Sequence, residues 1–421
     1  MAALTAGVTG SYVGYLAQRA FLGAESRKSK LKAAHTKAAQ KMTSEFLTLR
    51  GPAMKLGQAL SLQAGVLPDE MLSELATLQM SAPGMHPSLA RAQFKATMGS
   101  DPDELFKAFE PEPFAAASLG QVHRAVTRQG DKVAVKIQYP GIRAAVTNDF
   151  KWFRAVSKAA QLSGHVPESS IAELEEQILA ETDYAREAEN LEVFRERLAP
   201  LGFVEVPQVY RRYSGDNVLT MGLLEGSHLA EFLRARPSQR IRDQLGEHLF
   251  DLFYFQLLRL EAFHADPHWG NYLFRPDGSI GLVDFGCVKY LRPEFVATLH
   301  AIFLFPADRY GPEFNRLLDK RYALHGRKLS RAARRALSHF AETFYRTVYP
   351  PELEREGIPI DFADESLLQS YMREGASLMR SRAELPEYIL MARAESGMLA
   401  TLHRLRARVH TSRIVRKYLT R

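Results

Sequence analysis

The residues best suited to chemistry stand in two short stretches of the second half of the chain. His264, Asp266 and Asn271 lie in HADPHWGN at 264–271, and a DFG triplet that starts at Asp284 begins thirteen residues after Asn271. A carboxylate such as Asp266 can accept the proton of an attacking hydroxyl, while an amide oxygen and a second carboxylate are good ligands for Mg²⁺. Phosphoryl transfer needs these residue types, because it depends on positioning and on neutralising phosphate charge. The spacing predicts Asp266 as the base, and Asn271 and Asp284 as metal ligands.

A lysine farther upstream supports the same chemistry. Residues 121–127 (QVHRAVT) and 132–138 (KVAVKIQ) flank a QGD turn and alternate with the period of a strand, which predicts a β-hairpin. Lys136 ends the VAVK stretch, which has the form of the strand lysine that protein kinases hold against the α- and β-phosphates of ATP. Such a lysine requires a carboxylate partner, and we predict Glu187 in the acidic stretch that follows.

Two other interpretations of these stretches are weaker. His264, Asp266 and His268 alternate as the ligands of a hydrolytic metal site could. Alternatively, Asp266 could cap a turn and Asp284 could end a strand. Neither interpretation accounts for the VAVK lysine, the HADPHWGN stretch and the DFG triplet in this order, whereas ATP and Mg²⁺ chemistry accounts for all three.

The elements that must position these residues change in character along the chain. The first hundred residues have helical spacing, and a β texture begins near Phe114. An S-x-x-E capping pattern at Ser170 predicts one acidic helix that runs to about Leu198. Only a strand at 217–223 and a small hairpin at 272–283 interrupt the helical pattern that follows.

This order of elements predicts an α+β protein with two lobes. We expect an N-terminal helical extension over 1–100, an N-lobe with a small antiparallel sheet and a long helix over 101–226, and a largely helical C-lobe over 227–421.

An alanine-rich stretch, AAASLGQV at 115–122, stands where an ordinary kinase has a glycine-rich phosphate loop. Alanine restricts the positive φ angles that glycine supplies, so we expect a stiffer loop. The predicted ATP contacts on this loop are Ala115, Ala116, Ala117, Ser118, Gly120 and Gln121.

Taken together, these motifs resemble those of the UbiB/AarF family of atypical kinase-like proteins. The resemblance is carried by KLGQ at 55–58, the alanine-rich loop, ETD at 181–183 and HADPHWGN, in that order. It implies a protein-kinase-like fold whose helical extension covers the nucleotide cleft. It also implies binding of ATP with Mg²⁺ and a link to ubiquinone and other isoprenoid-lipid metabolism.

The resemblance also implies roles for further residues. Lys55 and Gln58 would enter the active site from the extension and face Glu181 and Asp183. The adenine-side residues would be Met221 and Leu223. Two positions depart from the family pattern: Trp269 replaces a usual proline, and Gly222 replaces a common acidic residue.

The segment after the DFG triplet bears on the substrate. Only residues 287–291 precede a new helical pattern that begins with RPE at 292, and no APE triplet follows. A protein kinase needs a longer segment there to dock a peptide. We therefore expect an ATPase or small-molecule kinase that supports ubiquinone or isoprenoid-lipid metabolism. An aminoglycoside-phosphotransferase-like enzyme and a non-catalytic, nucleotide-gated lipid-binding module remain as alternatives.

Composition sets the broad class. With 421 residues, of which 46% are hydrophobic and 24% charged, the chain can bury a core, and disorder is excluded. Cys287 is the single cysteine, so no internal disulfide forms and a reducing cytoplasm is expected. No apolar run is long enough for a spanning helix, and residues 2–18 fit neither a secretory signal nor a strong anchor.

The net charge of +7 is concentrated at one end of the chain. Residues 404–421 carry seven basic side chains and no acidic one, with apolar residues interleaved. This pattern favours a solvated C-terminal helix and leaves peripheral contact with an anionic membrane as an alternative. The expected partners are ATP and an isoprenoid lipid or quinone precursor, and no nucleic acid is expected.

Overall fold

The computed structural model describes residues 24–49, 85–117, 119–159, 168–266, 268–305, 309–348, 350, 355–381 and 385–419. The chain forms two compact units, one comprising Met1–Glu189 with Val209–Leu223 and the other Asn190–Gln208 with Leu224–Arg421. The larger sheet lies in the first unit and most of the long helices in the second, which confirms the α+β class. The predicted extension and most of the predicted N-lobe fall within the first unit, but residues 190–208 and 224–226, predicted as part of the N-lobe, belong to the second unit.

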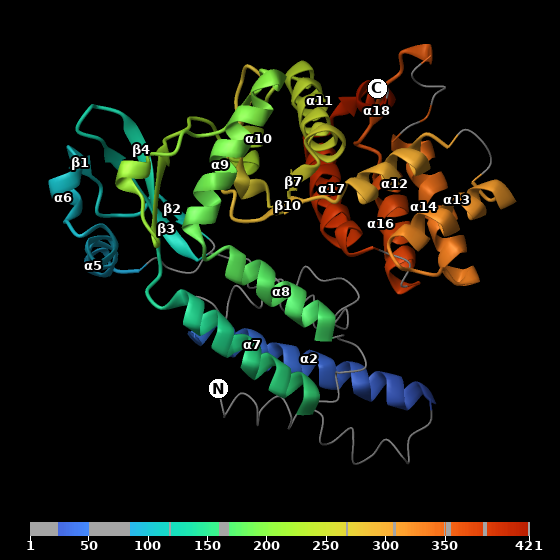
Figure 1. Ribbon diagram of the computed structural model, residues 1–421, viewed down its shortest axis with the longest axis horizontal. Helices are drawn as coiled ribbons and strands as arrows, with labels where there is room; N and C mark the ends of the chain where they lie inside the picture. The colour runs from blue at the N-terminus through green and yellow to red at the C-terminus, as the bar shows by residue number, and fades with distance from the viewer. Residues whose placement is uncertain are drawn as a thin grey trace. The chain divides into compact units, whose positions relative to one another are not determined.

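The first unit combines a small antiparallel sheet with helices before and after it (Figure 1). Its helices are α2 (Ala24–Leu49), α5 (Pro87–Met98), α6 (Pro102–Leu105), α7 (Ile142–Ala159), α8 (Glu168–Ala180), the start of α9 (Tyr184–Leu198) and a 3-10 turn (Arg211–Tyr213). Its strands are β1 (Ala108–Phe109), β2 (Ala115–Ala117), β3 (Gly120–Val126), β4 (Lys132–Gln138) and β6 (Val218–Gly222).

The sheet of the first unit has the order β1-β3-β4-β6, with β2 paired to β3. The predicted hairpin is confirmed, since β3 and β4 pair from Gly120 opposite Gln138 to Val126 opposite Lys132. The turn contains Gly130 at φ 100°, a conformation that glycine adopts readily. Apolar side chains of β4 and α5 form the core beneath the sheet, which places β4 at its centre.

The single long helix predicted from Ser170 to Leu198 is wrong, because two helices occupy this stretch. Ser170 lies inside α8 and does not cap it. The chain then breaks between α8 and α9, where the Thr182 hydroxyl donates to the Leu179 carbonyl and Asp183 accepts from the backbone N–H of Arg186 at 3.0 Å. Aspartate favours helix N-caps, so Asp183 starts a new helix within the acidic pattern.

The second unit is mainly helical (Figure 1). Its helices are the rest of α9, α10 (Leu229–Arg234), α11 (Gln239–Phe255) with a π-helical turn (Gln256–Leu260), α12 (Pro293–Phe303), α13 (Pro312–Leu324), α14 (Arg331–Val348), α16 (Glu365–Arg380), α17 (Pro386–Leu405), α18 (Thr411–Leu419) and 3-10 turns at Ala199–Leu201 and Trp269–Asn271. Its short strands are β5 (Val204–Glu205), β7 (Ala262–His264), β8 (Tyr272–Phe274), β9 (Ile280–Leu282), β10 (Val288–Tyr290), β11 (Ile360–Asp361) and β12 (Arg408–Val409). The predicted small hairpin is confirmed as β8 and β9, and the strand at 217–223 as β6.

The basic C-terminal segment is part of the core of the second unit. Its apolar residues are all at most 5% exposed: Leu405, Val409, Ile414, Val415 and Leu419. Arg413 pairs with Glu247 at 3.1 Å, and Lys417 pairs with Asp251 at 2.6 Å, both on α11. The expected C-terminal helix forms, and its Arg413 and Lys417 side chains are exposed, but its apolar side chains are buried in the core. The sequence pattern was amphipathic because α18 packs on α11.

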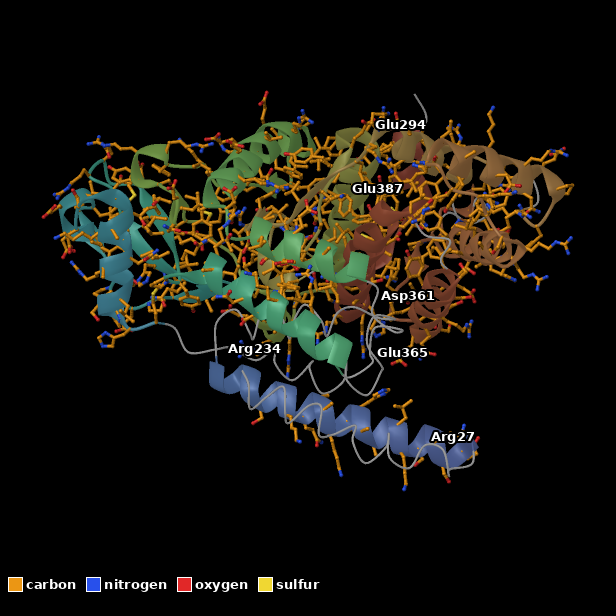
Figure 2. All side chains as sticks on the ribbon, turned by 60° about the horizontal axis from the view of Figure 1, so that its bottom comes forward. Arg27, Arg234, Glu294, Asp361, Glu365 and Glu387 are labelled. Atoms are coloured by element: carbon orange, nitrogen blue, oxygen red, sulfur yellow. The ribbon has the colours of Figure 1, made fainter. Side chains whose placement is uncertain are left out.

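Among the described residues, no helix combines the length and the hydropathy needed to cross a bilayer. The longest helix is α2, with 26 residues, and its sequence includes six basic residues. One of them is the exposed Arg27 (Figure 2).

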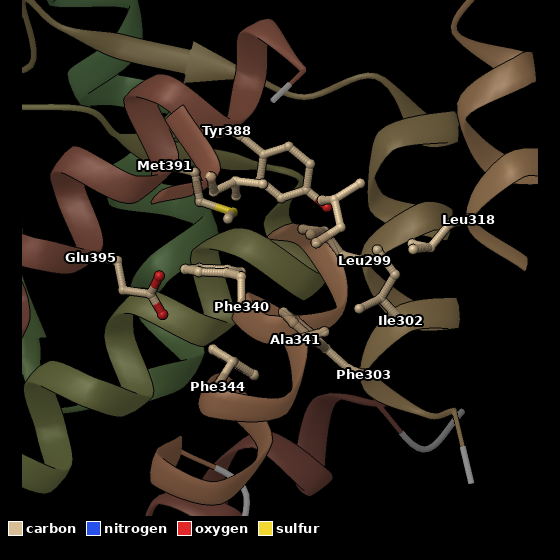
Figure 3. Close-up of a pocket in the computed structure, with 12 residues that line it drawn as sticks. Leu299, Ile302, Phe303, Leu318, Phe340, Ala341, Phe344, Tyr388, Met391 and Glu395 are labelled. Carbon is tan, nitrogen blue, oxygen red and sulfur yellow. The ribbon is translucent and has the colours of Figure 1, made fainter. Parts of the chain in front are cut away.

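A small cavity of about 20 Å³ lies among the helices of the second unit (Figure 3). Apolar side chains line most of it, including Leu299, Phe303, Phe340, Phe344 and Met391, and Glu395 lines one side. This volume accommodates about one water molecule. None of the predicted site residues lines it.

Candidate active site

The predicted lysine–glutamate pair forms in the first unit. Lys136, at the middle of β4, places its Nζ 2.7 and 2.8 Å from the two carboxylate oxygens of Glu187. The side chains are 5% and 0% exposed. Glu187 lies in the first turn of α9, where the helix dipole favours a negative charge. Lys136 Nζ also lies 5.0 Å from the centre of the Tyr184 ring. The pair is thus held from a strand and a helix at once.

The alanine-rich stretch forms a tight hairpin above this pair. Ala115 pairs with Val122 and Ala117 with Gly120 across β2 and β3. Gly120 is needed because a Cβ there would overlap the carbonyl oxygen of Ile137 and lie 2.8 Å from the Tyr184 hydroxyl. The predicted loop therefore takes the form of a β-hairpin, and Ser118 lies outside the described residues.

The side chain of Gln121 is bonded within the first unit, and the predicted contact of this residue with a nucleotide stays a prediction. Its side chain is fully buried, its Oε1 accepts from the backbone N–H of Met85 at 2.8 Å, and its Nε2 lies 2.9 Å from His123 Nε2. Strand alternation is the reason, because in β3 this residue points into the core. Burial lowers the pKa of His123, which keeps the neutral ring suited to this chain of hydrogen bonds.

The adenine-side residues lie on or beside β6. Met221 is 5% exposed and pairs with Ala134 of β4. The N–H of Leu223 donates to the Lys132 carbonyl at 3.1 Å, so this amide belongs to the sheet. Their contact with a nucleotide stays a prediction.

The residues that the family resemblance assigns to a guarded site are described only in part. Lys55 and Gln58 lie outside the described residues, and their roles stay predictions. Glu181 is buried in the turn between α8 and α9. Asp183 is the N-cap of α9, so its carboxylate has a structural use besides any contact with Lys55.

The predicted base and one predicted metal ligand contact each other in the second unit. Asp266 Oδ2 accepts from Asn271 Nδ2 at 3.0 Å, and its Oδ1 accepts from the backbone N–H of His268 at 3.2 Å. These bonds hold the carboxylate in place on the loop after β7. Burial, with a contribution from the charge of Asp266, raises the pKa of the neighbouring Tyr272, which therefore stays neutral.

The β8–β9 hairpin brings the second predicted metal ligand to the same place. Tyr272 pairs with Leu282, and the N–H of Val283 donates to the Asn271 carbonyl at 2.9 Å. Asp284 follows directly, with φ 65°, a left-handed conformation uncommon for aspartate. Its Oδ1 accepts from the N–H of Gly286 at 3.2 Å. The chain from Asn271 to Asp284 thus forms the β8–β9 hairpin, and its end returns close to its start.

His264 does not act as the metal ligand that was considered as an alternative from the sequence. It is 3% exposed, and its ring nitrogens lie 3.1 Å from the Asp266 carbonyl and 2.6 Å from the Asp284 carbonyl. Neither nitrogen is left for a metal ion. In the described part of the chain, no three His, Cys, Asp or Glu side chains group as a metal site. His264 instead connects the backbone of the predicted base to that of the DFG aspartate.

Sequence reasoning missed a second such connection, made by Asn190. Its side chain bonds to the Phe285 carbonyl and to the Tyr290 hydroxyl. The signal available was its position three residues after Glu187, because residues at i and i+3 share one side of a helix.

A strand lysine held by a helix glutamate, followed by a catalytic loop and a DFG segment joined by a hairpin, defines the class of protein-kinase-like proteins. Comparison with family models agrees: the ABC1 atypical kinase-like domain matches residues 77–309, more than half of the chain. The chain belongs to this family, which is the UbiB/AarF family.

Individual relatives give the same result. The chain is 31% identical over 277 residues to the yeast mitochondrial atypical kinase COQ8, covering 64% of this chain and 55% of that protein. It is 33% identical over 271 residues to the Arabidopsis chloroplast protein ACTIVITY OF BC1 COMPLEX KINASE 7, covering 63% and 39%. The match thus spans less than two thirds of these relatives.

A solved structure extends the likeness over nearly the whole fold. The complex of Rv3197 with erythromycin from Mycobacterium tuberculosis has a TM-score of 0.62 and 27% sequence identity, and covers 91% of this chain and 95% of that one. The likeness therefore includes the helices of the second unit that lie beyond the family match.

Proposed function

We propose that this protein binds ATP with Mg²⁺ and uses it, as an ATPase or small-molecule kinase, in isoprenoid-lipid or quinone metabolism. The observation that carries the proposal is the buried pair of Lys136 and Glu187. Burying two charges costs more than burying apolar side chains of the same volume, so such a pair is a poor device for stability. A role in binding phosphate oxygens through the lysine ammonium would explain the presence of the pair.

The donor set of the second unit suits a magnesium ion. The amide of Asn271 and the carboxylate of Asp284 supply the oxygen ligands that Mg²⁺ prefers. Neither residue carries a thiolate or an imidazole. When bound, the ion would neutralise charge on the phosphates. Asp266 would accept the proton of the attacking hydroxyl or water, while Lys136, oriented by Glu187, would hold the phosphates.

The substrate argument comes from the segment after Gly286. Residues 288–290 form β10, which pairs with β7, and α12 begins at Pro293 with a proline in its first turn. This segment is short and already paired, which supports a small molecule over a docked peptide. The mycobacterial relative was solved with erythromycin, a small and largely apolar molecule, which is consistent with this substrate class.

The metal-ligand assignment is tested by Asp284→Asn. We expect this variant to lose Mg²⁺-dependent ATP binding, because an amide is a poorer ligand than a carboxylate. The measurement is titration of a fluorescent ATP analogue with and without Mg²⁺. Asp364→Asn is the matched control, since Asp364 caps a helix at the surface and asparagine caps equally well. Retained Mg²⁺-dependent affinity in Asp284→Asn would remove the assignment.

Catalysis is separated from simple nucleotide binding by Asp266→Asn. If Asp266 is the base, this variant keeps ATP affinity and loses phosphate release or transfer, by about 100-fold or more. Phosphate release is measured with Mg²⁺-ATP, with and without anionic lipid vesicles. A wild-type protein that binds ATP but releases and transfers no phosphate under either condition would instead be a nucleotide-gated module.

A further inference from the structure

Asn190 lies where helix α9 meets the DFG segment. It is 3% exposed, and its Nδ2 donates to the carbonyl oxygen of Phe285 at 3.0 Å. Its Oδ1 accepts from the hydroxyl of Tyr290 on β10, also at 3.0 Å. Both polar atoms of the amide are therefore committed to the segment that follows Asp284.

This segment contains a backbone conformation that needs support. Asp284 has φ 65°, and a non-glycine residue keeps such an angle only when its surroundings determine it. His264 contacts the carbonyl of Asp284, and Asn190 bonds to the next carbonyl, that of Phe285. The Phe285 ring is fully buried against Phe194 of α9, with the ring centres 5.1 Å apart. The two peptide groups that follow Asp284 are thus each held by a buried side chain.

We propose that Asn190 is a positioning residue that sets the direction of the Asp284 carboxylate for Mg²⁺, which rests on the proposed function. Both polar side-chain atoms of Asn190 are bonded within the protein, so the residue acts through the backbone of Phe285. It stands three residues after Glu187 on α9, so one continuous helix carries both the partner of Lys136 and the support of the metal ligand. A change in the pitch or position of α9 would alter both together.

The expected signature is a changed requirement for Mg²⁺. Outer-shell hydrogen bonds orient metal ligands, and their loss typically lowers metal affinity. We therefore expect Asn190→Leu to raise the Mg²⁺ concentration for half-maximal ATP binding by about tenfold or more. Binding of ATP in the presence of a chelator should change much less, because Lys136 and Glu187 are untouched. Asn190→Ser serves as a second variant that lacks the reach of the amide but adds no bulk.

Two further variants separate positioning from packing. Tyr290→Phe removes only the hydroxyl bond to Asn190 and keeps the donor to Phe285, so its Mg²⁺ requirement should lie well below that of Asn190→Leu. Thr401→Val removes a buried side-chain bond to the Gly397 carbonyl on α17, elsewhere in the same unit, and should leave the requirement unchanged. Hydrogen exchange of residues 284–290 in nucleotide-free protein should be faster in Asn190→Leu and Asn190→Ser than in Thr401→Val.

The outcomes are distinct. A raised Mg²⁺ requirement, with faster exchange in 284–290, supports the proposal. An unchanged requirement in folded Asn190→Leu and Asn190→Ser overturns it, as does an equal loss of binding with and without Mg²⁺. If wild-type protein shows no Mg²⁺-dependent ATP binding, while Asp284→Asn behaves identically, the proposed function itself fails and this inference fails with it.

Discussion

The ammonium of Lys136 is buried in the first unit against the carboxylate of Glu187. Each ion loses most of its hydration on burial, and the attraction between the two at 2.7 Å offsets that loss. Removing either partner takes the close opposite charge away from a buried ion, which proteins tolerate poorly. Removing one member of the pair should therefore lower the free energy of unfolding strongly, whereas replacing both by apolar residues should lower it much less.

This difference leads to a prediction about single and double variants. Glu187→Leu should lower the free energy of unfolding by about 3 to 5 kcal/mol, whereas Lys136→Met combined with Glu187→Leu should recover most of that loss. ATP binding should stay lost in both. Urea denaturation and nucleotide titration check the two parts, with Glu189→Gln, an exposed acid on the same helix, as control. A double variant that binds ATP normally would show that the pair is only structural.

Glu395 is a second residue whose burial has consequences. It accepts hydrogen bonds from the hydroxyls of Tyr254, at 2.7 Å, and Tyr371, within the core of the second unit. Burial raises the pKa of Glu395 above its usual 4.5, and the two tyrosine bonds offset this only in part. The folded protein thus binds this proton more tightly than the unfolded chain does.

The sign of the resulting pH dependence follows from that difference. The stabilisation is fully present below the unfolded pKa and is lost as pH rises through the folded pKa, at up to about 1.4 kcal/mol per pH unit between the two. Glu395→Gln cannot lose this proton. We expect the difference in unfolding free energy between wild type and Glu395→Gln to move in favour of the variant as pH rises from 4.5. A difference that is constant with pH would show that Glu395 does not titrate in this way.

At the scale of elements, the alanine-rich hairpin depends on one residue without a side chain. A Cβ at Gly120 would overlap the Ile137 carbonyl, and backbone cannot move aside as a flexible side chain can. Gly120→Ala should therefore lower the free energy of unfolding by about 1 to 3 kcal/mol, as overpacking does. It should also weaken ATP binding, because β3 must move away from the Ile137 carbonyl of β4, the strand of Lys136, to admit the methyl group.

The control for Gly120→Ala is another glycine with room around it. A Cβ at Gly375, within α16, meets nothing within 4 Å, so Gly375→Ala should stabilise the protein by roughly 0.5 to 1 kcal/mol. Thermal or urea unfolding distinguishes the two. If both alanine variants were stabilising, the close packing between the hairpin and Tyr184 would be disproved.

At the scale of the molecule, the C-terminal segment belongs to the core of the second unit. Truncation before Thr411 would remove Ile414, Val415, Tyr418 and Leu419 from the core and leave Asp251 without Lys417. Each buried apolar side chain contributes roughly 1.5 to 3 kcal/mol, so we expect a large loss of stability and exposure of apolar surface. The lower urea midpoint and increased binding of a hydrophobic dye would measure it.

A charge-only variant isolates the electrostatic part of this prediction. Arg413→Gln with Lys417→Gln keeps the apolar contacts and removes two ion pairs whose basic side chains are exposed, which contribute about 1 kcal/mol each. The buried Asp251 keeps its bond from the Tyr418 hydroxyl. It should remain folded. A truncated protein as stable as the wild type would mean that α18 is not part of the core.

The predicted base and metal ligands could be identified from sequence because they lie close together along the chain. Asp266, Asn271 and Asp284 stand within one loop and one hairpin, so their spacing along the chain already determines that they meet. The Lys136 strand was likewise evident from alternation. Glu187 was a choice among several acids, and its pairing was confirmed because its position on α9 faces inward.

The features that sequence could not determine depend on contacts between distant parts of the chain. Alternation along β3 could not show which face is buried, so the bond between the Gln121 side chain and the backbone of Met85 was not predicted. The amphipathic C-terminal pattern was compatible with solvent, lipid or another helix, and only packing on α11 selected the last.

The sequence by itself thus determined the protein-kinase-like class and most of the order of elements, because both depend on residue types at short separations. Only the tertiary structure decided where the acidic stretch breaks at Asp183, and that Asn190 supports the DFG segment across 95 residues of chain. The reason is physical: the free energy that selects among compatible local patterns comes from burial and hydrogen bonding between elements, and that term is absent until the chain has folded.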